Sequence, residues 1–195
     1  MLQGKKVLLV VTGGIAAFKA LDLVRRLRER GCGVRAVLTE AATQFVTPLS
    51  LAALTGEKVH TELFSLTDEA EMGHIELSRS ADLVVIAPAT ANTLAKLANG
   101  LADDLASTLL LATDKPVLAA PAMNVRMWEH PATQANLTTL RARGTLFVGP
   151  NEGDMACGEF GPGRLSEPLE IVAAIEQVFG GSGPLSGKRA IVTSG

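Results

Sequence analysis

Short apolar runs alternate along the chain with segments whose apolar residues recur at helical spacing. Val7 to Val11 is a continuous apolar run and predicts a buried strand. Thr12-Gly13-Gly14 follows as a tight turn, and Ala16 to Arg30 has the spacing of an amphipathic helix that Gly31 ends. Val34 to Leu38 predicts a second strand. This strand-helix-strand unit implies a parallel sheet with a right-handed crossover.

The alternation continues to the end of a first domain. The helix pattern of residues 41–54 is interrupted at Pro48, and the glycine-rich stretch from Asn151 to Gly163 predicts a loop. The remaining predicted strands are 82–87, 116–120 and 145–148, and the remaining predicted helices are 91–98, 104–112, 131–143 and 167–179. We therefore expect one α/β domain over residues 1–179.

The last residues have a different composition. Residues 180–187, GGSGPLSG, predict a flexible linker. Lys188 to Val192 then predicts a new strand, and Thr193-Ser194-Gly195 resembles the turn after it. We expect residues 188–195 to be the start of a second α/β domain.

Composition narrows the class of protein. The 195 residues include 47% hydrophobic and 19% charged residues, with 18 Lys and Arg against 20 Asp and Glu. This balance gives no basic surface typical of nucleic-acid or membrane binding. Cys32 and Cys157 are far apart and form neither a disulfide framework nor a zinc motif. This cysteine usage makes a reducing cytoplasm the expected location, and the first residues do not resemble a signal peptide or a membrane span.

The turn at Gly13-Gly14 has the outline of a phosphate or nucleotide site, because the N-terminus of the following helix offers free N–H groups. The full dinucleotide fingerprint G-x-G-x-x-G is absent, although Glu40 follows the second strand roughly where a ribose-binding acid would lie. A dinucleotide site and glycines that serve only the turn both remain open here.

Two further polar stretches follow predicted strands and so should lie at the same sheet edge, where ligands bind in open α/β folds. PATANT at 88–93 supplies Thr90, Asn92 and Thr93, which exceeds what one helix cap requires. PAMNVRMW at 121–128 supplies Asn124, whose short amide can donate to a carboxylate without adding charge.

Two residues are candidates for proton transfer. His74 lies in a polar loop, and an imidazole titrates near neutral pH, although a lone histidine is more often structural. Cys157 lies in a glycine-rich segment that is a poor place for a core cysteine, so an exposed thiol there is a plausible proton donor. Cys32, between two glycines after a helix, is interpreted as structural.

Together these motifs resemble the homo-oligomeric flavin-containing cysteine decarboxylases over residues 5–179. The resemblance rests on His74, PATANT, PAMNVRMW and the segment around Cys157, in this order and spacing. It implies a Rossmann-like flavoprotein fold, a three-layer sandwich around a central parallel sheet. It also implies FMN as cofactor, and trimers, often assembled into dodecamers, with FMN at the subunit interfaces. The residues expected to contact FMN are Gly13, Gly14, Thr39, Thr90, Asn92, Thr93, Ser107 and Met123.

The same resemblance assigns roles to the candidate catalytic residues. His74 should act as the base, Asn124 should hold the substrate carboxylate, and Cys157 should serve in the final reduction. Arg126 and Met127 are expected to join Asn124 in binding the substrate. Within the family the chain is most similar to members of coenzyme A biosynthesis, whose substrate is phosphopantothenoylcysteine. The tail PLSGKRAIVTSG resembles the first strand of the ligase domain that follows in bifunctional members.

The expected chemistry explains why a flavin is needed, because losing CO2 from an ordinary α-carbon leaves an unstabilised carbanion. Hydride transfer from the thiol-bearing carbon to a flavin gives a thioaldehyde, into which electrons can flow as CO2 leaves. Protonation of the resulting enethiolate, with Cys157 as the expected donor, and return of the hydride give a saturated thiol. Three other readings stay open: a non-catalytic flavoprotein, a flavin prenyltransferase and an NAD-dependent oxidoreductase.

Overall fold

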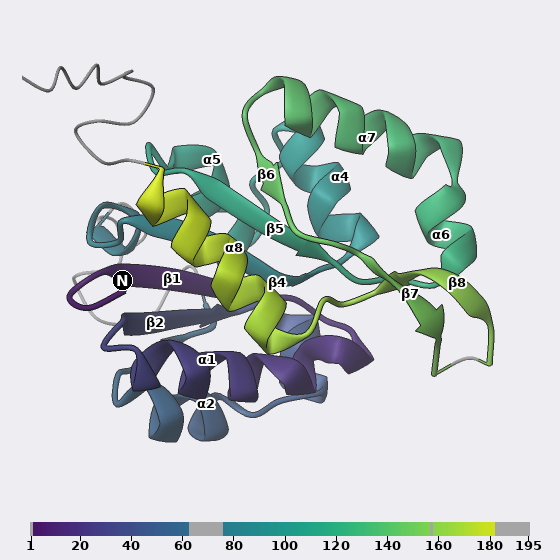
Figure 1. Cartoon of the computed structure of the whole chain (residues 1–195). Coiled ribbons are helices and arrows are strands. Elements are labelled where there is room, and N and C mark those ends of the chain that lie inside the picture. The colour runs from purple at the N-terminus through teal and green to yellow at the C-terminus, as the bar shows by residue number, and fades with distance from the viewer. Residues whose placement is uncertain (1, 63–75, 157, 182–195) are drawn as a thin grey trace, which may run out of the picture.

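The computed structural model describes residues 2–62, 76–156 and 158–181 (Figure 1). His74, Cys157 and the predicted second-domain start at 188–195 lie outside the described residues, as does all of the predicted linker except Gly180 and Gly181. No helix in the described part of the chain is long and apolar enough to cross a bilayer.

A six-stranded sheet forms the centre of the fold, in the order β3-β2-β1-β4-β5-β6, and every neighbouring pair is parallel. The strand order reverses between β1 and β4, which makes their carboxyl ends the topological switch point. The strands are β1 (Lys6–Val11), β2 (Gly33–Leu38), β3 (Val59–His60), β4 (Leu83–Ala89), β5 (Val117–Pro121) and β6 (Leu146–Phe147).

Helices cover both faces of this sheet and produce a three-layer sandwich (Figure 1). One face packs against α1 (Lys19–Glu29), α2 (Pro48–Thr55) and α8 (Pro168–Gly180). The other face packs against α4 (Ala91–Asn99), α5 (Leu105–Ala112) and α7 (Pro131–Ala142). The expected Rossmann-like α/β architecture is therefore confirmed.

The apolar runs become central strands because both of their faces are buried. In β1, Leu9 packs into the layer of α1 and α8, whereas Leu8 and Val10 pack into the layer of α4, α5 and α7. Each of these side chains is fully buried. Since side chains alternate between the two faces of a strand, a strand covered on both sides needs a continuous apolar run.

Two predicted helices have different boundaries from those expected. The first helical segment begins as a 3₁₀ turn, η1 (Ile15–Phe18), which leads directly into α1. Pro48 does not interrupt one helix but begins α2, after the short η2 (Glu40–Gln44). Thr47 caps α2 by accepting the Ser50 N–H at 3.1 Å, and proline is well suited to a first helical position, where its missing N–H costs nothing.

The prediction of a loop from Asn151 to Gly163 is wrong. This segment contains an antiparallel hairpin formed by β7 (Asn151–Asp154) and β8 (Phe160–Arg164). Gly161 and Gly163 adopt φ values of 150° and 140°, which residues with a side chain rarely adopt. Because glycines occupy these positions, the strand shows no alternation of apolar side chains. The hairpin and the short α6 (Val125–Glu129) lie side by side at one end of the molecule, near the carboxyl end of β5 (Figure 1).

Candidate functional site

A cleft of about 930 Å³ opens at the topological switch point. It brings together the loops that follow β1, β2, β4 and β5, with part of the β7–β8 hairpin. Its volume is within the range of roughly 300–1,000 Å³ typical of small-molecule and cofactor sites. Nine residues predicted to bind cofactor or substrate line it: Gly13, Gly14, Thr39, Thr90, Asn92, Thr93, Met123, Asn124 and Met127.

The glycine turn after β1 forms one side of the cleft. Gly13 packs so closely on Ala41 that an added Cβ would lie 2.8 Å from the Ala41 carbonyl carbon. Gly14 is the N-cap of η1 and provides no side-chain hydrogen bond to its first turn. Backbone N–H groups at the start of the continuous segment η1–α1 are therefore available to a bound anion. Ile15 and Phe18 add large apolar side chains, which are 62% and 57% exposed.

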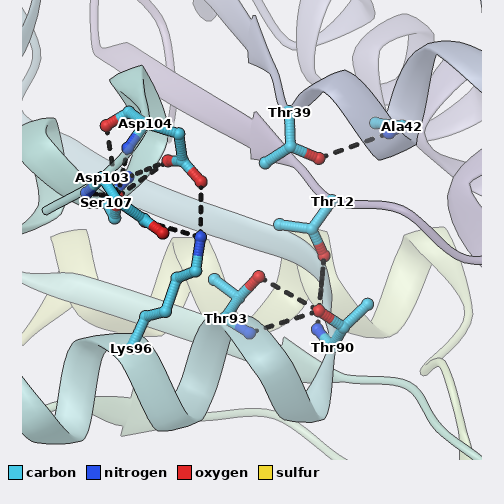
Figure 2. A network of polar contacts seen from close by, with 9 residues as sticks. All are labelled: Thr12, Thr39, Ala42, Thr90, Thr93, Lys96, Asp103, Asp104 and Ser107. Carbon is cyan, nitrogen blue, oxygen red and sulfur yellow. Dashed lines mark hydrogen bonds and ion pairs between the residues drawn. The ribbon is translucent and has the colours of Figure 1, made fainter. Parts of the chain in front are cut away.

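Three threonine hydroxyl groups that line the cleft connect the carboxyl ends of two strands (Figure 2). The Thr12 hydroxyl donates to the Pro88 carbonyl at 2.6 Å and accepts the Thr90 N–H at 3.2 Å. The Thr90 hydroxyl caps α4 by accepting the Thr93 N–H at 3.3 Å, and it lies 3.0 Å from the Thr93 hydroxyl. This network fixes the ends of β1 and β4 relative to each other. Thr12, which connects them, was not singled out from the sequence.

Thr39 and Asn92 line other parts of the cleft. The Thr39 hydroxyl accepts the Ala42 N–H at 3.3 Å and so caps η2. Asn92 is exposed on the first turn of α4, where its amide can reach a ligand. Thr39 thus shapes the loop after β2, while Asn92 offers a polar group to the cleft itself.

A charged cluster lines the cleft beside α4, and sequence reasoning missed it (Figure 2). The Lys96 ammonium lies 2.6 Å from an Asp103 carboxylate oxygen and 2.9 Å from one of Asp104. Hydrogen bonds raise the pKa of Lys96, and the bond to Asp103 has a larger effect than the bond to Asp104. Lys96 lies three residues after Thr93 on α4, and this helical spacing is the signal that could have placed it on the cleft side.

Ser107, a predicted FMN contact, supports this cluster instead of lining the cleft. Its hydroxyl accepts the N–H groups of Asp103 and Asp104 at 3.1 Å and 3.0 Å and donates to the Asp104 carboxylate at 2.8 Å. These bonds use the full capacity of a hydroxyl group. Burial raises the pKa of Asp104, but the Ser107 N–H and the Lys96 ammonium outweigh it and hold that pKa below its ordinary value. The FMN contact of Ser107 stays a prediction.

Asn124 is held at the rim of the cleft by two hydrogen bonds. Its Oδ1 accepts the Met127 N–H at 2.9 Å and caps α6, while its Nδ2 donates to Glu159 Oε2 at 3.0 Å. Met127 also lines the cleft, but Arg126 does not. The Arg126 side chain is 79% exposed and lies 3.9 Å from Glu159, and its substrate contact stays a prediction.

The hairpin is fixed beside Asn124 through the backbone. The Met123 N–H donates to the Gly163 carbonyl at 3.0 Å, and any side chain at Gly163 would overlap the Met123 carbonyl oxygen. Met155 and Ala156 also line the cleft, so the turn of the hairpin contributes to it. The predicted catalytic residues His74 and Cys157 lie outside the described residues, and their roles stay predictions.

Comparison with known proteins gives a consistent result. Residues 1–180 match the family model described as Flavoprotein. The chain is 50% identical over 194 residues to the coenzyme A biosynthesis bifunctional protein CoaBC of Vibrio vulnificus (strain YJ016), and 50% identical to the CoaBC of Escherichia coli (strain K12). Each match covers 100% of this chain and 48% of the relative, so the chain spans about half the length of these proteins.

Solved structures show the same fold. A PPC decarboxylase mutant complexed with pantothenoylaminoethenethiol has a TM-score of 0.78 and 36% identity, covering 90% of this chain and 98% of that one. The FMN binding protein AtHal3 has a TM-score of 0.78 and 34% identity, covering 93% and 100%. The FMN-dependent cysteine decarboxylase SpaF has a TM-score of 0.77 and 32% identity, covering 91% and 99%.

Proposed function

The chain belongs to the flavoprotein family, and from this premise we propose that it is an FMN-dependent decarboxylase. Its proposed substrate is 4′-phospho-N-pantothenoylcysteine and its product is 4′-phosphopantetheine. The observation that carries the proposal is that one cleft gathers the glycine turn, the PATANT stretch and Asn124. Similarity to a PPC decarboxylase and to CoaBC proteins supports this choice of substrate.

The residues of the cleft fit FMN. Gly14 has no side chain to block or cap the first N–H groups of η1, so a phosphate can approach the backbone at this helical start. Ile15, Phe18 and Met123 offer apolar surface to a flat ring system, and Asn92 offers an amide to its polar edge. The dinucleotide alternative loses support, because the glycine fingerprint is broken and the family is that of flavoproteins.

When bound, FMN would supply a reversible hydride acceptor for the thiol-bearing carbon of the substrate. The protein has to bind the substrate, orient its carboxylate and move protons. Asn124 would hold the carboxylate through an N–H group that adds no positive charge. The substrate carboxylate is then not stabilised so strongly that its loss as CO2 is opposed. Because Met127 N–H already binds Asn124 Oδ1, the amide presents its nitrogen side to a ligand.

His74 and Cys157 complete the proposed machinery. His74 would remove the thiol proton as the hydride leaves, and Cys157 would protonate the product-forming enethiolate. Met155 and Ala156 support the second role, because they place the turn that precedes Cys157 on the cleft. This combination favours a decarboxylase over a non-catalytic flavoprotein or a flavin prenyltransferase, which would not need the cysteine.

The assembly and the wider protein are also part of the proposal. We infer a homo-oligomer, a trimer or dodecamer, with FMN at the subunit interfaces, acting in the cytoplasm. Exposed Ile15 and Phe18 at the cleft support this, because a second subunit would remove their apolar surface from water. Residues 1–179 would form the decarboxylase domain, 180–187 the linker, and 188–195 the start of a ligase domain that joins phosphopantothenate and cysteine.

The test is turnover by the purified protein loaded with FMN, with the product identified by mass spectrometry. The parent should convert phosphopantothenoylcysteine to a product lighter by one CO2. His74→Asn should retain FMN but lose turnover, and Cys157→Ser should accumulate an oxidised decarboxylated product. A parent that binds FMN but leaves the substrate unchanged contradicts the proposal, and normal turnover by either variant removes that residue from the mechanism.

A further inference from the structure

The Glu159 carboxylate lies between the Asn124 amide, the proposed binding group for the substrate carboxylate, and the Arg126 guanidinium. Its Oε2 accepts the Asn124 Nδ2–H at 3.0 Å, and its Oε1 lies 3.9 Å from Arg126 Nε. The Glu159 side chain is 37% exposed, so its carboxylate is partly withdrawn from water. Neither the sequence motifs nor the proposed mechanism assigns this residue a role.

The hydrogen bonds of Asn124 determine what its amide can offer. An asparagine side chain has one carbonyl oxygen and two N–H donors. Met127 N–H occupies the carbonyl oxygen and Glu159 accepts one donor, which leaves one N–H for a ligand. With both ends of the amide held, the direction of the remaining N–H is fixed before the substrate arrives, which reduces the cost of ordering it on binding.

The backbone keeps Glu159 in place for this contact. The Met155 N–H donates to the Glu159 carbonyl at 2.8 Å within the hairpin turn, and Met123 N–H joins the Asn124 loop to Gly163 of β8 at 3.0 Å. The two partners therefore come from separate elements that are connected by main-chain hydrogen bonds. The contact between Glu159 and Asn124 is consequently a property of the local fold.

We propose that Glu159 is a positioning residue that orients the Asn124 amide toward the carboxylate of the substrate. This inference rests on the proposed function. Glu159 would act through Asn124 and would not touch the substrate. Arg126 offsets part of the negative charge of Glu159. The hydrogen bond from Asn124 to Glu159 should therefore outweigh the repulsion between the Glu159 carboxylate and the substrate carboxylate.

The experiment uses two ligands that differ only in the carboxylate: phosphopantothenoylserine and phosphopantothenoylethanolamine. Both carry a hydroxyl in place of the thiol, so binding is measured without turnover, by calorimetry on the FMN-loaded protein. The variants are Glu159→Ala, which removes the acceptor, and Glu159→Gln, whose side-chain oxygen can still accept the bond. Glu152→Ala is the matched control, because Glu152 is an exposed acid on β7 that does not line the cleft.

Glu159→Ala should weaken binding of the serine ligand roughly tenfold, the scale of one charge-assisted hydrogen bond, and leave the ethanolamine ligand unchanged. Glu159→Gln should restore most of that affinity, and Glu152→Ala should affect neither ligand. Equal effects on both ligands, no effect, or tighter binding of the serine ligand by Glu159→Ala overturns the inference while leaving the decarboxylase proposal intact. A parent that binds neither ligand overturns the proposed function, and the inference with it.

Discussion

Substitution of Gly13 by alanine tests how the cleft is built. Gly13 lies in the turn after β1, and its φ is outside the left-handed region, so any penalty is steric and not conformational. A Cβ at this position would overlap the Ala41 side chain and lie 2.8 Å from the Ala41 carbonyl carbon. Because one of these atoms is backbone, relief requires η2 to move away from β1.

The expected cost follows from overpacking a well-fitted contact, which typically destabilises a protein by about 1–3 kcal/mol. For a domain of this length, each kcal/mol lowers Tm by about 2–4 °C. Gly14→Ala is the matched control, because the nearest heavy atom to its added Cβ is the Thr90 methyl carbon at 3.8 Å, an ordinary van der Waals distance. Its stability should stay within about 0.5 kcal/mol of the parent.

Thermal unfolding of the parent, Gly13→Ala and Gly14→Ala, each with and without added FMN, separates the two effects. Gly13→Ala should unfold at a lower temperature in both conditions. It should also gain less from FMN, because Gly13 and Ala41 both line the cleft and a bound ligand stabilises according to its affinity. Equal stability of the two alanine variants would refute the close packing on which this reasoning depends.

Three further predictions concern charge and thiol chemistry. Lys96→Met should weaken FMN retention and lower stability, because Asp104 would keep its partly buried charge without the cation 2.9 Å away; unchanged Tm and FMN affinity would contradict this. The pKa of Asp104 is lowered in the folded state, so the stability it contributes is present above the ordinary value of about 3.9 and is lost as the pH falls through the folded value. The stability difference between the parent and Lys96→Met should therefore narrow as the pH falls below about 4; a difference that does not depend on pH would count against the assignment. Burial raises the pKa of Cys32 to about 11, so in a Cys157→Ser variant the remaining thiol should resist a thiol reagent at pH 8 until the protein unfolds; rapid labelling of the native protein would show that Cys32 is accessible.

The layers of the fold could be predicted because burial on both faces leaves a clear mark on the sequence. The continuous apolar runs of β1 and β4 mark strands buried on both faces, and the helical spacing of α1 marks a helix buried on one face. The β7–β8 hairpin was missed because its glycines are needed for their positive φ values and for close contacts with neighbouring atoms. Neither need leaves a pattern of apolar residues in the sequence. Its place beside Asn124 depends on a main-chain contact between Met123 and Gly163, which no local pattern records.

The candidate site was predictable only where its residues form contiguous motifs. PATANT and the Asn124 stretch follow strands directly, and parallel strands bring such loops to one edge. Lys96, Asp103 and Glu159 were missed because their roles depend on partners from other elements of the fold. Conversely, the Ser107 hydroxyl serves a capping box at the start of α5, a structural role that resemblance alone does not separate from cofactor binding.

The central claim is a redox-neutral decarboxylation supported by this cleft and its flavin. The most direct test supplies the FMN-loaded protein, without oxygen or any added electron acceptor, with phosphopantothenoylcysteine labelled with ¹³C in the cysteine carboxyl group. We expect one labelled CO2 for each 4′-phosphopantetheine formed, over many turnovers. Release of CO2 that stops after a single turnover, or that requires an external oxidant, would contradict the account.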